Sequence, residues 1–233
     1  KKGHFDRAKE LYDRDLKLCR ELGDKQGLSI TLGLMGDLLL EKGEFEEAII
    51  HLDEQLRLAE ELNYQKGIAG ALGSLGDTYF HQLEYEKALA VYQRGIRICE
   101  EIDNKRMLIM IVMRVVELAL IMEKEPEEIR IYSKKADLLA DDIGNEELIF
   151  MTSVKRAQVE IAHGHKQEAL GILISLLEMA PTAEEKSEVL FVLGISPNVP
   201  NPEKYRQEGR ELFDSLFKKT PKYDYLSKQK MLS

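Results

Sequence analysis

Histidines and clustered carboxylates are the side chains of this 233-residue chain that could do chemistry. The sequence His163-Gly164-His165 offers two imidazoles that could share a metal ion, because histidine nitrogens are common zinc ligands. The motif has no cysteine or carboxylate neighbour at ligand spacing, so we expect a solvated turn there. Carboxylate pairs such as Glu46-Glu47 stand beside lysines and arginines, which is typical of an exposed charged helix face.

The glycine-rich segment GIAGALGSLG, which begins at Gly67, could be mistaken for a phosphate-binding loop. It falls in the middle of a predicted helix and follows no strand, which argues against phosphate binding. Each glycine in a helix interior costs up to about 1 kcal/mol relative to alanine, so each needs a reason. Close packing of a neighbouring helix explains Gly76, and we expect Gly70 and Gly73 to leave room for a ligand. The sequence therefore predicts no enzyme, no catalytic residue, no cofactor and no metal site.

The elements that would position such residues repeat every 40 residues. GEFEEAIIHL from Gly43 lies 40 residues before LEYEKALAVY from Leu83, and 40 after GHFDRAKELY from Gly3. The preceding segment repeats too, since LMGDLLLEKG from Leu34 corresponds to SLGDTYFHQL from Ser74. Apolar residues at helical spacing with this period predict an all-α superhelix, a solenoid of antiparallel helix pairs. A solenoid favours a binding function over catalysis.

The predicted organisation has three parts. Residues 1–194 form the repeat array, which starts in mid-repeat; 195–202 form a proline-rich loop; and 203–233 form a C-terminal capping helix with a basic tail. We expect helices near 5–22, 26–42, 45–62, 65–82, 85–102, 105–123, 126–142, 145–163, 166–178, 183–194 and 203–218. The repeat at 105–142 is degenerate, because Glu128 stands where Ala48 and Ala88 stand one and two periods earlier. A carboxylate there must turn outward or find a cation, so helix 126–142 should pack less closely than its equivalents.

Charge and cysteine content narrow the partners. The net charge is −9, and residues 203–233 carry +3 of it, which leaves −12 on the rest of the chain. Nucleic acid binding requires a basic stripe, so we expect no nucleic acid partner. No run of 18 apolar residues exists, so we expect no membrane partner. Cys19 and Cys99 lie two periods apart on different repeats, too far for a disulfide, and reduced thiols suit a cytoplasmic protein.

The repeat resembles the tetratricopeptide repeat family. The family signature is W-x2-L-G-x2-Y followed by A-x3-F and P, and the chain matches it at Leu75-Gly76 with Tyr79 and at Ala88 with Tyr92. The chain departs from it with Leu32 and Leu72 at the tryptophan position, without the closing proline, and with a period of 40 rather than 34. The longer form is similar to the repeat arrays of kinesin light chains, of the adaptor that binds GoLoco peptides, and of bacterial regulators.

The resemblance implies that the first helix of each pair lines a concave groove. The position after Gly36 and Gly76 then reads Asp37, Asp77, Glu117 and Gln158 in successive repeats. We expect a ladder of carboxylates with apolar residues beside it, although Asp37 and Asp77 could instead bond neighbouring groups and hold the stack together. The predicted binding residues are Asp37, Leu40, Asp77, Phe80, His81, Met110, Met113, Arg114, Glu117 and Gln158.

The leading interpretation is a protein–protein interaction module, a scaffold or regulatory domain of a larger protein, that binds a basic and apolar peptide or helix in this groove. The alternative is a self-association element that forms a homodimer. A regulatory domain that senses a small molecule is the third interpretation, and it is the weakest because polar groups do not converge in the groove.

Overall fold

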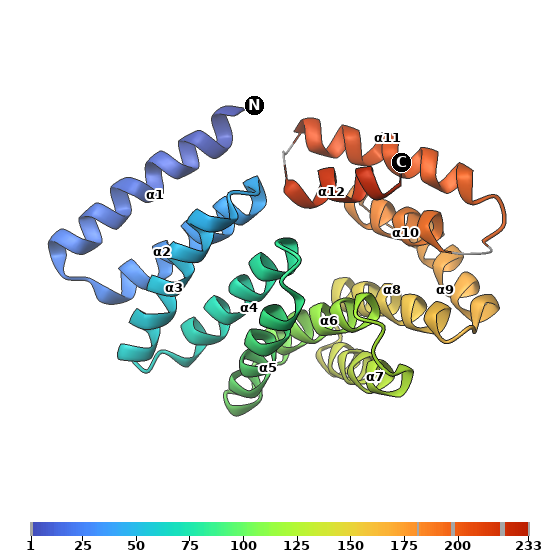
Figure 1. Ribbon diagram of the computed structural model, residues 1–233, viewed down its shortest axis with the longest axis horizontal. Helices are drawn as coiled ribbons and strands as arrows, with labels where there is room; N and C mark the ends of the chain where they lie inside the picture. Colours follow the sequence, from blue (N-terminus) through green and yellow to red (C-terminus); the bar gives the residue numbers. More distant parts are fainter. Residues whose placement is uncertain (1, 181, 197–198, 220–221, 233) are drawn as a thin grey trace. The chain divides into compact units, whose positions relative to one another are not determined.

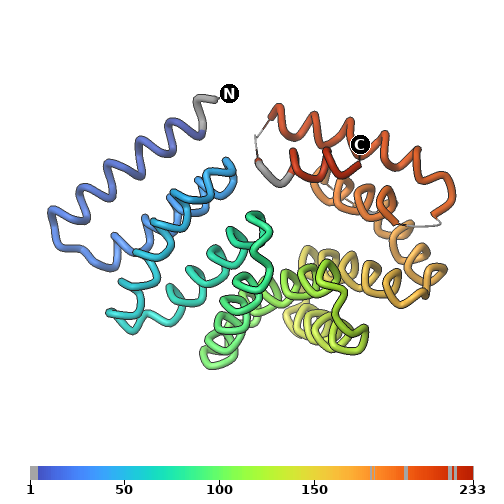
Figure 2. Tube along the Cα trace, in the orientation of Figure 1, coloured from blue at the N-terminus to red at the C-terminus, as the bar shows by residue number. Residues whose placement is uncertain are grey.

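The computed structural model describes residues 2–180, 182–196, 199–219 and 222–232, which form twelve α-helices and no strand (Figure 1). The predicted all-α helical repeat architecture is confirmed. Successive helices run antiparallel and are joined mostly by turns of two to four residues (Figure 2). The helices are α1 (Lys2–Leu22), α2 (Lys25–Lys42), α3 (Phe45–Glu61), α4 (Gln65–His81), α5 (Tyr85–Glu101), α6 (Lys105–Ile121), α7 (Pro126–Ile143), α8 (Glu146–Ala162), α9 (Lys166–Met179), α10 (Ala183–Ile195), α11 (Pro202–Lys219) and α12 (Tyr223–Met231).

The chain divides into two compact units, Lys1–Leu118 and Ala119–Ser233. The division falls inside α6, so the first unit holds α1 to α5 and most of α6, and the second holds α7 to α12. It does not coincide with the loop at 195–202, where the sequence suggested that the array ends. Each unit has its own core, as expected for helix pairs that bury their apolar faces against neighbours.

The turns explain the 40-residue period, because one left-handed residue ends each helix at intervals of 20. These residues are Gly23, Gly43, Asn63, Leu83, Asp103 and Glu123, followed after 21 residues by Gly144 and then by Gly164. The next amide along the chain bonds back to the helix end, as Glu84 N does to Tyr79 O at 2.9 Å. This 6→1 bond satisfies a carbonyl that the helix end would otherwise leave without a partner. Two turns therefore make one repeat.

Close packing in the first unit depends on a glycine that faces a large side chain. A Cβ placed on Gly36 would lie 2.5 Å from Leu52 Cδ2, and one placed on Gly76 would collide with the ring of Tyr92. Leu52 and Tyr92 are fully buried. The sequence interpretation of Gly76 as a close helix crossing is consistent with this geometry, since only a residue without a side chain admits the ring.

The degenerate repeat contains one extra residue, which corrects the predicted register. Every helix from α2 to α9 begins two residues after its left-handed turn residue, except α7, which begins three residues after Glu123. The extra residue moves Ile129, not Glu128, into the position of Ala88. Ile129 is buried and Glu128 is exposed. The carboxylate thus points outward, as expected, but it was never the counterpart of the close-packed alanine.

The C-terminal segment folds back on the second unit. The sequence analysis placed no helix after Lys218, yet Tyr223–Met231 form α12. Leu232 lies against Gly194 of α10 and Gly209 of α11, where added Cβ atoms would approach its methyl groups to 2.9 and 2.8 Å. Arg210 donates to the carbonyl of Leu232 at 3.0 Å, and Lys228 donates to Glu188 at 2.6 Å. These contacts cover the last apolar face of the stack with both α11 and α12.

Candidate binding surface

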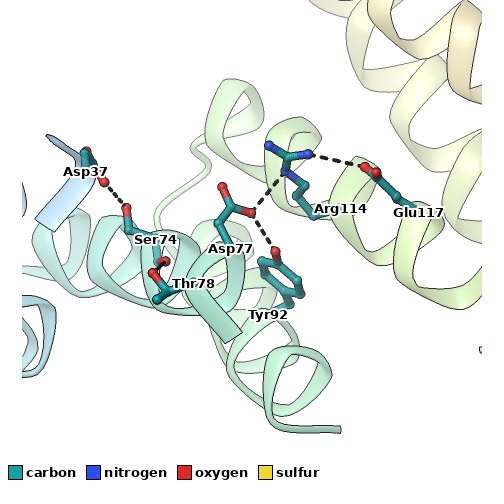
Figure 3. A network of polar contacts seen from close by, with 7 residues as sticks. All are labelled: Asp37, Ser74, Asp77, Thr78, Tyr92, Arg114 and Glu117. Carbon is teal, nitrogen blue, oxygen red and sulfur yellow. Dashed lines mark hydrogen bonds and ion pairs between the residues drawn. The ribbon is translucent and has the colours of Figure 1, made fainter. Parts of the chain in front are cut away.

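The first helices of three consecutive repeats, α2, α4 and α6, are linked side by side in the first unit. Ser74 Oγ of α4 donates to Asp37 Oδ1 of α2 at 2.6 Å, and Arg114 Nε of α6 lies 3.0 Å from Asp77 Oδ1 of α4 (Figure 3). We call the surface they share the α2–α4–α6 face. It comprises Ile30, Leu34, Asp37, Gly70, Ser74, Asp77, Met110, Arg114 and Glu117.

The acidic row on this face is held by hydrogen bonds. The hydroxyl of Tyr92 donates to Asp77 Oδ1 at 2.6 Å, on the same oxygen that Arg114 reaches. Arg114 also lies 3.3 Å from Glu117. Asp37, Asp77 and Glu117 therefore have partners within the fold, which agrees with the structural role that the sequence left open. Three carboxylates against one guanidinium still leave the row negative, and the second oxygen of Asp77 turns away from Tyr92 and Arg114 (Figure 3).

Electrostatics differ between the two ends of this network. Loss of hydration raises the pKa of Asp37; the hydrogen bond from Ser74 opposes the rise, and the charges of Asp77 and Glu41 add to it. Burial raises the pKa of Tyr92 well above its usual value, and the neighbouring charge of Asp77 raises it further. Tyr92 consequently remains a hydrogen-bond donor at any physiological pH, whereas Asp37 holds its negative charge less firmly than an ordinary carboxylate.

An apolar row runs beside the acidic row. Ile30 on α2 is 45% exposed and Met110 on α6 is 43% exposed. Gly70 occupies the same repeat position on α4 between them, and a Cβ placed on it would meet no atom within 4 Å. Two exposed apolar side chains thus flank an open backbone position. The expectation that Gly70 leaves room on this surface is consistent with the space found there.

Several predicted binding residues lie elsewhere. Met113 is 5% exposed, which corrects its expected place on the surface, because it packs beneath the face rather than on it. Leu40 packs against the core of α2 and α3. His81 stacks on Phe45 with ring centroids 6.0 Å apart, and Phe80 lies against Tyr85, so both aromatic residues belong to the ends of the helices. Gln158 lies on α8 in the second unit, where its Oε1 is buried without a hydrogen-bond partner.

Sequence reasoning missed three residues that shape this face. Ser74 and Tyr92 hold Asp37 and Asp77, and Leu34 is an exposed leucine one turn before Asp37. The spacing of Ile30, Leu34 and Asp37 at i, i+4 and i+7 could have placed all three on one helix face. Nothing in the sequence alone pairs Ser74 with Asp37, since these residues are 37 positions apart.

The fold and this face define a helical-repeat solenoid. Residues 27–101 match the family model described as tetratricopeptide repeat, so the resemblance seen in the sequence is confirmed over that segment. Repeats of this family are generally protein–protein interaction scaffolds and typically not enzymes. No curated protein matches the chain.

Solved structures share the fold at low sequence identity. The apo form of RapI is 12% identical with a TM-score of 0.66, over 88% of this chain and 82% of RapI. BtubC (BKLC) from P. vanneervenii is 14% identical with a TM-score of 0.63, over 98% of this chain and 90% of BtubC. These likenesses support the helical-repeat architecture. Among the residues that the structure describes, no helix combines the length and apolar character needed to span a bilayer.

Proposed function

We propose that this chain binds a segment of a partner protein, a peptide or a helix, against the α2–α4–α6 face. The observation that carries the proposal is the pairing of two rows on one face. The row of Ile30, Gly70 and Met110 offers exposed apolar surface with an open place at its centre. The row of Asp37, Asp77 and Glu117 offers carboxylates that the fold already holds in position.

The spacing of the rows describes the ligand. They lie seven residues apart along each helix, which corresponds to about 10 Å and to nearly the same side of the helix. A ligand side chain over Gly70 would be covered on both sides by Ile30 and Met110. A lysine or arginine about 10 Å away would meet the carboxylates. The expected partner is therefore a basic and apolar segment, with charge setting specificity and association rate more than affinity.

The open position at Gly70 permits a direct test. Gly70→Leu should fill the gap without disturbing the fold, because nothing lies within 4 Å of the added Cβ. Peptides selected from a random library on the unmodified chain should be rich in lysine, arginine and apolar residues, and Gly70→Leu should weaken their binding at least tenfold. Gln93→Leu, on the exposed side of α5, is the matched control and should bind normally. Acidic selected peptides, or equal binding by Gly70→Leu, would refute the proposal.

The carboxylate row is tested best at Asp37. Asp77→Asn would disturb Tyr92 and Arg114 together, which mixes stability with binding. In Asp37→Asn the amide oxygen can still accept from Ser74, so only the charge is removed. We expect the association rate of a basic peptide to fall and its salt dependence to weaken. Unchanged association kinetics would show that Asp37 has no part in recognition.

A second candidate function, self-association, has one observation in its favour. Leu11, Leu18 and Leu22 form an exposed stripe along α1, whereas Leu58, which lies 40 residues after Leu18, is buried. A two-fold dimer would cover this stripe. Sedimentation equilibrium should then show a dimer that Leu18→Glu dissociates. A chain that remains monomeric at high concentration would exclude this candidate and leave peptide binding as the function.

A further inference from the structure

The turn between α8 and α9 brings together groups that the sequence analysis kept apart. We expected His163-Gly164-His165 to lack carboxylate neighbours, but one ligand atom from each of Glu160, His165 and Glu168 lies within 4.8 Å of the other two. Gly164 takes a left-handed conformation that reverses the chain, and the amide of His165 donates to the carbonyl of Glu160 at 2.9 Å. The turn therefore folds the last residues of α8 against the first turn of α9.

The core of this group is a nearly buried carboxylate. The side chain of Glu160 is 12% exposed, and its Oε2 lies 2.7 Å from His165 Nδ1. Glu168 approaches from α9 and is exposed. A single ion pair between Glu160 and His165 would explain this contact by itself. It does not explain the second imidazole of the turn.

His163 supplies the independent observation. Its Nδ1 lies 2.7 Å from the carbonyl oxygen of Val159, which can only accept, so Nδ1 carries the proton and Nε2 holds a lone pair. That Nε2 is buried and has no hydrogen-bond partner. The ring stacks beside that of His165, with centroids 6.5 Å apart. An imidazole whose other nitrogen donates to a backbone carbonyl is in the tautomer that binds a metal.

We propose that this turn binds a divalent transition-metal ion through Glu160, His165 and Glu168, with His163 as the neighbouring fourth donor. Mixed imidazole and carboxylate donors suit Zn²⁺, whereas Ca²⁺ requires six to eight oxygen ligands. Ligands of a tetrahedral zinc ion stand about 3.3 Å apart, given bonds of about 2.0 Å, so Glu160 and His165 would separate slightly. The bound ion would tie α8 to α9, because its donors come from the end of one helix and the start of the next.

Titration of the full, tag-free chain with ZnCl2 followed by calorimetry tests the proposal. We expect one zinc ion per chain and a rise in the thermal midpoint with zinc concentration, because the ion binds the folded state. Glu160→Gln and His165→Ala should each weaken zinc binding at least tenfold. His51→Ala is the matched control, since the ring Nδ1 of His51 on α3 is also buried without a partner, and it should bind zinc normally.

Cobalt absorption keeps the test decisive if a variant unfolds. Co²⁺ bound to the unmodified chain should show the intense visible bands of tetrahedral coordination, and Glu168→Gln, at an exposed position, should reduce them without loss of structure. Absence of zinc binding, equal binding by Glu160→Gln, or equal competition by Mg²⁺ or Ca²⁺ would each overturn the proposal. The outcome is separate from peptide binding, which the α2–α4–α6 face alone would mediate.

Discussion

Helices α5 and α7 hold the same place in successive repeats, yet they bury residues that differ by one step in the 40-residue period. In α5 the buried residues include Ala88, Tyr92, Gly95 and Cys99, and in α7 they are Ile129, Ser133, Ala136 and Ala140. Each member of the second set lies 41 residues after its counterpart. One added residue before α7 rotates the sequence by about 100° relative to the repeat, since a helix has 3.6 residues per turn. Turn length, rather than the helix sequence, therefore sets which face is buried.

Burying a carboxylate in either helix should produce the largest effect and test the shifted register. Ala88→Glu and Ile129→Glu should each lower the free energy of unfolding by more than about 3 kcal/mol, because an unpaired charge enters the core. Glu128→Ala should change it by less than about 0.5 kcal/mol, as for other exposed positions. Urea denaturation measures all three. A large loss in Glu128→Ala together with a tolerated Ile129→Glu would restore the unshifted 40-residue register.

Two alanine substitutions in α4 should sharpen what distinguishes the regular repeats. Gly76→Ala should destabilise the chain by about 1–3 kcal/mol, because the new methyl group overlaps the buried ring of Tyr92. Gly70→Ala should stabilise it by up to about 1 kcal/mol, since the position is open and alanine is the better helix former. Thermal and urea unfolding of the two variants give the comparison. Equal changes of the same sign would mean that close packing at Gly76 is not what holds this pair.

The turn between α4 and α5 should gain stability from the residue that the other regular turns use. Leu83 adopts φ +64°, while Gly43 ends the equivalent turn at φ +80°. The left-handed conformation costs a side chain about 1–2 kcal/mol and glycine loses part of that as entropy, so Leu83→Gly should stabilise the chain by about 0.5–1 kcal/mol. Gly43→Leu should show a loss of similar size. If Leu83→Gly destabilises instead, the exposed leucine has a packing role.

The smallest expected effect concerns charge at the repeat position that reads Asp37 in the first unit and Gln158 in the second. The pKa of Asp37 is higher in the folded chain than its ordinary value of 3.8, so its ionised form weakens folding. Protonation therefore restores stability as pH falls through the raised pKa toward 3.8, and that stability is lost as pH rises. Asp37→Asn should be more stable than the unmodified chain at pH 7 by less than about 1 kcal/mol, given solvent screening.

Urea midpoints of Asp37→Asn and of the unmodified chain, measured between pH 7 and pH 4, give the pH dependence. The two curves should converge toward the acidic end. Parallel curves would mean that the ionised carboxylate is not disfavoured in the fold.

Much of the architecture could be read before any coordinates because its causes are local. Apolar spacing placed eleven helices close to their observed ends, and the pairs of small and large residues, such as Gly76 with Tyr92, followed from the repeat. The candidate face was located by the same period, which put Asp37, Asp77 and Glu117 at one position. Met113 was misplaced because its spacing fits an exposed and a buried side of α6 equally well until the neighbouring helices are known.

The sequence by itself determined the helices, the 20-residue spacing of their turns and the all-α class, because helix formation and helix capping depend on residues within a few positions of one another. Only the tertiary structure decided which oxygen of Asp77 receives Tyr92 and Arg114, that Ile129 replaces Glu128 in the core, and that Glu160 meets His165 across a turn. These outcomes depend on the rotation of each helix against its neighbours. One residue in a turn changes that rotation by about 100°, while it leaves the helical pattern of the sequence intact.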